Sequence, residues 1–124
     1  PKEEPVLTGT DQLAGTSWEW LYTQSPVDKA EPAEPKNYVL TFTTDGRITG
    51  TADCNRMLGT YRAGDRQVLF RGLATTRKMC PSGSLGDRFA RELNVVRGYT
   101  FYTPDTLRMD MQADGGTFTF RRVK

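Results

Sequence analysis

The fold is decided by residues 38–51, which read YVLTFTTDGRITGT. Aromatic or aliphatic residues occupy every second position before the Asp45-Gly46 pair, and an alternating pattern resumes after it. Alternation with a period of two is typical of a strand with one buried face, and Asp-Gly is typical of a tight primed hairpin turn. These residues therefore predict two antiparallel strands, 38–43 and 48–51.

Similar patterns on both sides of this hairpin predict a meander of about eight strands. Trp18, Trp20 and Tyr22 alternate along a first strand that begins at Thr16. The prolines and charged residues of 23–36 exclude a helix interior or a central strand, so this segment is predicted to be a surface loop. Further strands are predicted at 59–62, 67–70, 73–78, 98–102, 106–111 and 116–122.

One helix interrupts the strands. Apolar residues recur at spacings of three and four at Leu85, Phe89, Leu93 and Val96. Ser84 is a suitable N-cap, and Asp87 lies in the electropositive first turn. We therefore predict a helix at about residues 84–97 that packs on a curved sheet or plugs an open barrel. The predicted fold class is mainly β, an antiparallel meander closing into an open barrel-like sheet with one packed helix.

The 124 residues suit one folded domain. Residues 1–11 begin with a polar, proline-flanked stretch and are predicted to be a disordered linker, followed by a single domain at 12–124. No run approaches the roughly 18 apolar residues of a membrane-spanning helix, and no signal-peptide pattern is present. We expect an exported protein whose signal has been removed, with a lipid anchor upstream as one way of holding it near a membrane.

Charge and composition indicate a protein without catalytic activity. The formal net charge is +2, from 17 basic and 15 acidic residues spread along the chain, so nucleic acid is not an expected partner. The absence of histidine removes the most frequent general base and the most frequent metal ligand. The aspartates lie mostly at predicted turns, where this residue is common anyway. We predict no enzyme activity, no cofactor and no structural zinc.

The two cysteines, Cys54 and Cys80, allow more than one interpretation. An even pair in a small domain is typical of one disulfide in an oxidising compartment, where it would stabilise the fold by about 3 kcal/mol. Two buried thiols in a cytosolic protein would give the same sequence, and a redox-active pair is a further alternative. Catalytic dithiols usually have Cys-x-x-Cys spacing, so we favour the structural disulfide.

Three blocks of sequence stand out. They are 15–18, which reads GTSW, 53–61, which reads DCNRMLGTY, and 75–80, which reads TTRKMC. In the second block, Asn55 and Gly59 are predicted to provide left-handed or positive-φ backbone at a turn. A contact with a ligand through Asn55 and Arg56 is the alternative, because loops on a rigid sheet often carry function.

Together the blocks resemble the META/HslJ family, whose members carry Gly-Thr-x-Trp, Cys-Asn-x-x-x-Gly-x-Tyr and Thr-x-x-Met-Cys or a variant with one more residue. The resemblance covers residues 12–123. The matching positions are Gly15, Thr16, Trp18, Asn55, Arg56, Gly59, Tyr61, Thr76 and Met79. Asp53 departs from the pattern, since many members have glycine before the Cys-Asn pair.

The resemblance implies a compact, barrel-like antiparallel sheet with one helix in bacterial envelope or secreted proteins, many of them lipoproteins. Members are associated with the heat-shock response and with tolerance to novobiocin, and no catalytic residues are established. Together with the cysteine pair, this implies a location in the periplasm, at the outer membrane or outside the cell.

The expected function is that of a monomeric, non-enzymatic envelope domain. It would support envelope integrity or stress tolerance through contact with an unknown envelope protein or an anionic glycolipid, for which the many arginines are suited. Solvated strand faces are the simpler explanation of those arginines. Two alternatives remain: a carrier of a small ligand or acyl chain in a cracked β-barrel, and an inhibitor of a secreted hydrolase that uses the Cys54–Gly59 loop.

Overall fold

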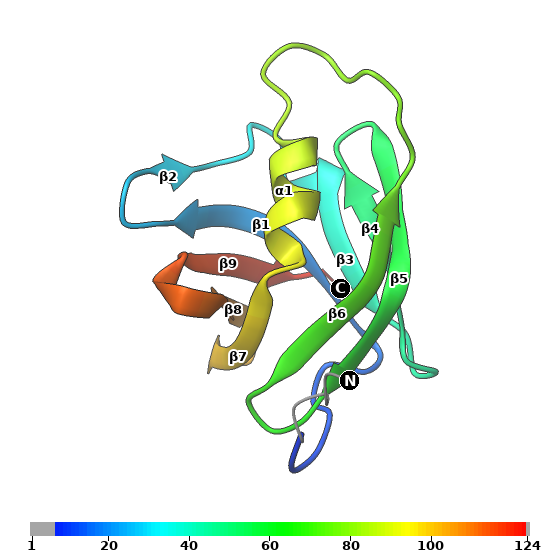
Figure 1. Cartoon of the computed structure of the whole chain (residues 1–124), viewed down its shortest axis with the longest axis vertical. Coiled ribbons are helices and arrows are strands. Elements are labelled where there is room, and N and C mark those ends of the chain that lie inside the picture. The colour runs from blue at the N-terminus through cyan, green and yellow to red at the C-terminus, as the bar shows by residue number, and fades with distance from the viewer. Residues whose placement is uncertain (1–6, 124) are drawn as a thin grey trace.

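The computed structural model describes residues 7–123, which form one antiparallel sheet curled around a single helix (Figure 1). The main path of the sheet runs β6-β5-β4-β3-β1-β9-β8-β7. Its strands are β1 (Thr16–Gln24), β3 (Tyr38–Phe42), β4 (Arg47–Ala52), β5 (Asn55–Ala63), β6 (Val68–Thr75), β7 (Val96–Thr103), β8 (Thr106–Met111) and β9 (Thr117–Arg122). The predicted fold class, a mainly β half-barrel with one helix, is confirmed.

Three short elements complete the described chain. Strand β2 (Lys29–Ala30) pairs with the end of β1, so the predicted surface loop at 23–36 contains a small hairpin. Two 3-10 helices, η1 (Pro35–Asn37) and η2 (Gln112–Asp114), lie in connections. No helix in the described part of the chain has the length and apolar character needed to cross a membrane.

The hairpin of β3 and β4 has the predicted pairing, from Tyr38 opposite Ala52 to Phe42 opposite Ile48. Its turn differs in one respect. Gly46 has a φ of 86°, whereas Asp45 does not have a positive φ, so the turn is not the primed type that the Asp-Gly pair predicted. A longer loop, closed by a hydrogen bond from Thr43 N to Arg47 O (2.9 Å), relieves Asp45 of the left-handed conformation.

The helix α1 (Gly86–Leu93) closes the half-barrel. Strands β6 and β7 are the two ends of the sheet, and they meet through an isolated bridge between Gln67 and Gly98. In the view of Figure 1, α1 lies above β7. A side chain at Gly86 would place its Cβ 2.6 Å from the carbonyl oxygen of Ala52 in β4, so the absence of a side chain permits this close approach.

Aromatic side chains join the helix to the sheet. Phe89 of α1 is fully buried and stacks on Trp20 of β1, with ring centroids 4.8 Å apart and planes inclined by 16°. Tyr38 of β3 and Phe118 of β9 meet Phe89 edge-on at 5.6 and 6.0 Å. These rings bring strands from both halves of the sheet to one helix, so the interior is occupied by packed side chains.

The helix is shorter than the predicted 84–97. It ends at Leu93 because Val96, counted in its apolar stripe, begins β7 and pairs with Met111 of β8. Ser84 is not the N-cap, since Leu85 occupies that position without a side-chain hydrogen bond. The Ser84 hydroxyl oxygen instead accepts a hydrogen bond from Gly86 N (3.1 Å), so it still bonds a free amide of the first turn.

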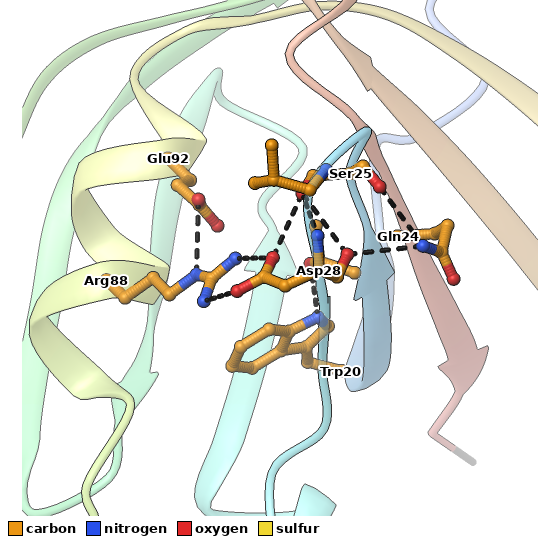
Figure 2. A network of polar contacts seen from close by, with 8 residues as sticks. Trp20, Gln24, Ser25, Asp28, Arg88 and Glu92 are labelled. Atoms are coloured by element: carbon orange, nitrogen blue, oxygen red, sulfur yellow. Dashed lines mark hydrogen bonds and ion pairs between the residues drawn. The ribbon is translucent and has the colours of Figure 1, made fainter.

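A polar network fixes the outer side of α1 to the β1–β2 hairpin (Figure 2). The Arg88 guanidinium donates to both carboxylate oxygens of Asp28, at 2.9 and 3.0 Å, and to Glu92 at 3.2 Å. Asp28 also accepts a hydrogen bond from the Ser25 hydroxyl at 2.9 Å. A two-pronged arginine–carboxylate contact orients both partners, so the network sets how the hairpin lies against the helix.

Replacing Asp28 with asparagine tests this network through its pH dependence. The hydrogen bond from Arg88, followed by that from Ser25, lowers the pKa of Asp28. A carboxylate with a lowered pKa in the folded state stabilises that state at neutral pH, and the effect is lost as the carboxylate becomes protonated. We expect Asp28→Asn to lower the melting temperature at pH 7, with the difference from wild type shrinking as the pH falls below about 4.

Thermal unfolding followed by circular dichroism measures the melting temperatures of the variant and of the wild type at each pH. Asp114→Asn is the matched control, because Asp114 has no ion pair within residues 7–123 and its φ of 56° is one that asparagine tolerates. A difference between Asp28→Asn and wild type that stays constant from neutral to acidic pH would contradict the assignment.

Candidate functional site

The connection between β6 and α1, residues 76–85, projects beyond the ends of β5 and β6 (Figure 1). We call it the stapled loop, because a disulfide joins its Cys80 to Cys54 in the turn between β4 and β5. The Cα atoms of the two cysteines are 5.6 Å apart. The structure thus bears out the predicted disulfide, which fixes the middle of the loop to the sheet.

Asn55, the first residue of β5, provides a second attachment. Its side-chain oxygen accepts hydrogen bonds from Lys78 N (2.7 Å) and the Thr76 hydroxyl (2.8 Å). Its amide nitrogen donates to Lys78 O (3.0 Å) and to Cys80 Sγ (3.4 Å). The residue is only 6% exposed, so its hydrogen-bonding capacity is directed at the loop. Asn55 therefore determines the path of residues 76–80.

The predicted backbone roles of Asn55 and Gly59 are wrong. Neither has a positive φ, and the left-handed residue of this region is Asp53, with a φ of 60°. Aspartate tolerates that conformation better than most residues, and glycine tolerates it best, which explains how Asp53 can stand where many family members have glycine. Glycine at position 59 has a different role, because a Cβ there would lie 3.0 Å from Arg71 O in the neighbouring strand, which is a tight contact.

The Cys54–Gly59 segment is not a projecting loop either. Residues 55–59 belong to β5 and pair with β4. An inhibitory loop cannot be located there, because its backbone hydrogen bonds are already used within the sheet. The projecting segment of this region is the stapled loop.

An exposed apolar residue next to positively charged residues distinguishes the stapled loop. The Met79 side chain is 98% exposed, and its neighbours Arg77 and Lys78 are exposed as well. Arg56 of β5 lies beside them, since its backbone exchanges hydrogen bonds with Thr76 (3.0 Å each). Within residues 7–123, no carboxylate forms an ion pair with Arg56, Arg77 or Lys78. This cluster therefore presents charge that the rest of the described chain does not neutralise.

Two hollows adjoin the cluster. A polar hollow of about 440 Å³ lies under the stapled loop, with Asn55, Lys78, Ser84 and Asp87 in its lining. An apolar groove of about 740 Å³ lies on the outer face of β3, β4, β5 and β6, and we call it the outer groove. Its lining includes Val39, Thr41, Thr49, Thr51, Leu58 and Ala74. Thr75 and Thr76 line both hollows, so they form one continuous surface.

The remaining motif residues lie away from this surface and have structural contacts. Trp18 is fully buried, and its indole N–H donates to the Thr16 hydroxyl (2.7 Å). Gly15, with a φ of 81°, donates its backbone N–H to Phe42 O (2.7 Å). The Gly15 bond holds the start of β1 against β3, and the Trp18 bond lies within β1. The motif blocks thus divide into a structural group and the group at the stapled loop.

Tyr61 belongs to the structural group and holds the start of the described chain. Its hydroxyl donates to the Asp11 carboxylate (2.8 Å), and burial followed by this contact raises the pKa of Tyr61. Asp65 bonds the same segment by donating its N–H to Thr8 O (2.9 Å) and accepting from Thr10 N (2.8 Å). Residues 8–11 of the predicted linker are therefore attached to the sheet, while residues 1–6 lie outside the described part of the chain.

Sequence reasoning named Arg56 as a possible ligand contact, but it did not place Arg56, Arg77 and Lys78 together beside Met79, and it did not indicate the outer groove. One signal was present, because residues 47–80 contain seven basic and two acidic residues, a formal charge of +5 in a chain whose total is +2. No such signal existed for the groove. Its lining comes from four strands, and their register decides which side chains meet.

These features define a class of protein, an antiparallel half-barrel plugged by one helix and carrying a disulfide-stapled loop at one end. A family model of the META domain matches residues 11–124. The chain belongs to the META domain family.

Solved structures of other proteins share this fold. The NMR structure of a protein from Burkholderia xenovorans matches with a TM-score of 0.74 and 22% identity, over 100% of this chain and 96% of that one. The crystal structure of a DUF4847 family protein from Bacteroides vulgatus matches with a TM-score of 0.62 and 22% identity, over 89% and 94%. Among curated protein sequences, none matches this chain. At these identities the likeness concerns the fold alone.

Replacing Asn55 with alanine tests its control of the stapled loop. The substitution leaves Lys78 N and Lys78 O without their side-chain partner, and a polar group without a partner costs about 1–3 kcal/mol when it stays buried. We expect a loss of unfolding free energy of that size in denaturant titrations, together with faster hydrogen exchange at the Lys78 amide.

Gln112→Ala is the matched control, because Gln112 is an exposed amide side chain without a hydrogen bond to the described residues. It should leave both measurements unchanged. If the Lys78 amide of the Asn55→Ala protein exchanges hydrogen at the same rate as in the wild type, Asn55 does not hold the loop.

Proposed function

We propose that this chain is a non-enzymatic domain of the bacterial cell envelope, in the periplasm or on a lipoprotein. It contributes to envelope integrity or stress tolerance through a contact made by the stapled loop. The observation that carries the proposal is the 98% exposure of Met79 on a backbone held by the disulfide and by Asn55. A rigid loop loses little conformational entropy when it binds, so this arrangement suits a contact surface.

The chemistry around the loop supports a binding role over a catalytic one. Asp87 is the one carboxylate in the lining of the polar hollow, and the chain has no histidine. General acid–base chemistry needs a positioned donor and acceptor with matched pKa values. The side chains gathered here are instead cationic, apolar or hydroxylic, which suits recognition of a surface.

The disulfide supports the proposed location. Disulfides persist in the periplasm and outside the cell, whereas cytosolic reductants keep most thiols reduced. Cys54 and Cys80 are both partly accessible to solvent, so a reducing compartment would act on them directly. An oxidising compartment therefore matches the state in which the stapled loop is held.

Met79→Ser tests the proposal in cells that lack the chromosomal copy of this gene. The variant removes the apolar tip, and because Met79 is exposed, the unfolding free energy should change by less than about 0.5 kcal/mol. We expect the wild-type protein to restore exclusion of a hydrophobic fluorescent dye and growth with novobiocin, and Met79→Ser to fail in both assays.

Val27→Ser is the matched control, because Val27 is 91% exposed but lies in the connection between β1 and β2. This control should restore both phenotypes. Full restoration by Met79→Ser, at equal protein level, would refute the role of the loop.

The outer groove favours a second candidate function, the carriage of a small ligand or acyl chain. Trp20, Phe89 and Phe118 are fully buried and fill the interior, so a ligand would lie outside the half-barrel. The groove is predominantly lined by methyl and aliphatic groups and has Leu58, 59% exposed, at its surface. Such a surface suits an apolar chain.

Titration with a fluorescent long-chain fatty acid tests the carrier function. Leu58→Glu places a charge in the groove, and desolvating it should weaken binding at least about tenfold. Val27→Glu adds the same charge elsewhere and should leave the affinity unchanged. Equal binding by wild type and Leu58→Glu would exclude the outer groove as the ligand site.

A further inference from the structure

We infer that the stapled loop docks on an anionic lipid bilayer, with Met79 inserted among the headgroups and Arg56, Arg77 and Lys78 on their phosphates. The inference rests on the proposed function and names the partner of the same site. The phosphate groups that the cations bind are those of lipid headgroups. We call the four residues the docking cluster.

Charge is unevenly distributed along the sequence and in space. Residues 47–80, with their formal charge of +5, form β4, β5, β6 and the first half of the stapled loop. These are neighbouring strands in the sheet, shown in green in Figure 1. The rest of the chain carries a formal charge of −3. The molecule therefore has a cationic half, which an anionic surface would attract and orient.

The docking cluster brings together three cations of this half that are available to bind phosphate. Its three cations lack ion pairs within residues 7–123, whereas Arg47 in the same half pairs with Asp45 at 3.8 Å. Asp87 is the one carboxylate in the adjoining hollow, so the local balance remains positive. Arginine forks match the geometry of phosphate oxygens, and lysine adds a mobile point charge.

Met79 provides the apolar part of the contact. Its side chain projects into solvent directly after Arg77 and Lys78 in the chain, and a flexible thioether adapts to irregular apolar surroundings. Interfacial binding of proteins combines burial of apolar side chains with attraction to anionic lipids. Leu58 lies on the same outward face of β5 as Arg56, two residues away, and adds a second apolar group.

The two sides of the stapled loop differ in charge, which sets the orientation of docking. Pro81, Ser82 and Gly83 line a further hollow together with Glu34 and Asp53, and since Lys36 pairs with Glu34 at 3.9 Å, these groups carry a net charge of −1. This acidic side would be repelled by anionic headgroups. The side with the docking cluster therefore faces the bilayer, and the acidic side faces away.

Other anionic partners fit the observations less well. Single-stranded nucleic acid is usually held by aromatic stacking platforms, and the docking cluster contains no aromatic residue. An acidic protein would need a pocket shaped for the protruding Met79, whereas a fluid bilayer accepts an apolar tip without a matching pocket. The test below can also detect binding to nucleic acid, to an acidic protein or to a second copy of this chain.

The test is flotation of the oxidised full chain with vesicles of equal parts phosphatidylglycerol and phosphatidylcholine, compared with phosphatidylcholine alone. We expect binding to the anionic vesicles only, weakening as salt is added. The variant R56Q/R77Q/K78Q should bind about a hundredfold more weakly, at about fivefold for each basic residue. The control K29Q/R91Q/R108Q removes the same charge from the other half and should bind within about threefold of wild type.

Insertion is measured separately with Met79→Trp. Trp18 and Trp20 are fully buried, so a blue shift on adding anionic vesicles, and quenching by brominated lipid, would report residue 79. Absence of the shift, equal binding to both vesicle types, or equal loss in the two charge variants would overturn the inference. Preferential binding of an oligonucleotide or an acidic polypeptide over the vesicles, or dimers in sedimentation under the same conditions, would overturn it as well.

The vesicle experiments and the Met79→Ser experiment in cells can fail independently of each other. If Met79→Ser fails in cells but the wild-type chain does not bind anionic vesicles, the contact is with another partner and this inference alone is overturned. If the chain binds vesicles through the docking cluster but Met79→Ser restores both phenotypes, lipid docking stands and the proposed role in envelope integrity does not.

Discussion

The stacking of Phe89 on Trp20 is the contact on which the rest of the structure depends. A curled sheet with two unjoined ends would expose its apolar interior to water, and hydrophobic burial is the main favourable term in folding. Phe89 brings the helix into that interior, where rings from β3 and β9 also meet it. The half-barrel is therefore stable without complete closure between β6 and β7.

The same constraint produces the surface that we propose to be functional. Because α1 must enter the half-barrel beside β4, the chain leaves the end of β6 and crosses to Gly86 through an extended connection. A free connection of this length would be mobile. The disulfide and Asn55 hold it to the β4–β5 turn, so the exposed Met79 occupies a defined position. The adjacent residues Cys54 and Asn55 thus both stabilise the stapled loop and hold Met79 in its exposed position.

The family motif contains residues of both kinds. Trp18 and Tyr61 stabilise the end of the sheet where the described chain begins, and neither contributes to the exposed surface. Asn55 is also a structural residue, but what it stabilises is the exposed loop. A motif position can therefore be needed for function without contacting a partner. Arg56 and Met79 are exposed motif residues of the stapled-loop surface, and Thr76 is exposed there too but bonds Asn55 through its hydroxyl.

The sequence by itself determined the features that depend on neighbouring residues. Alternation at 38–51, the presence of a helix around Phe89 and the availability of two cysteines are local or compositional properties, and they were predictable. Only the tertiary structure decided where the helix ends, that Asp53 is left-handed, and that Arg56 lies beside the stapled loop. The physical reason is that each of these depends on how the strands pair, β7 with β8, β4 with β5, and β5 with the chain after β6, and the pairing register also determines which side chains share a surface.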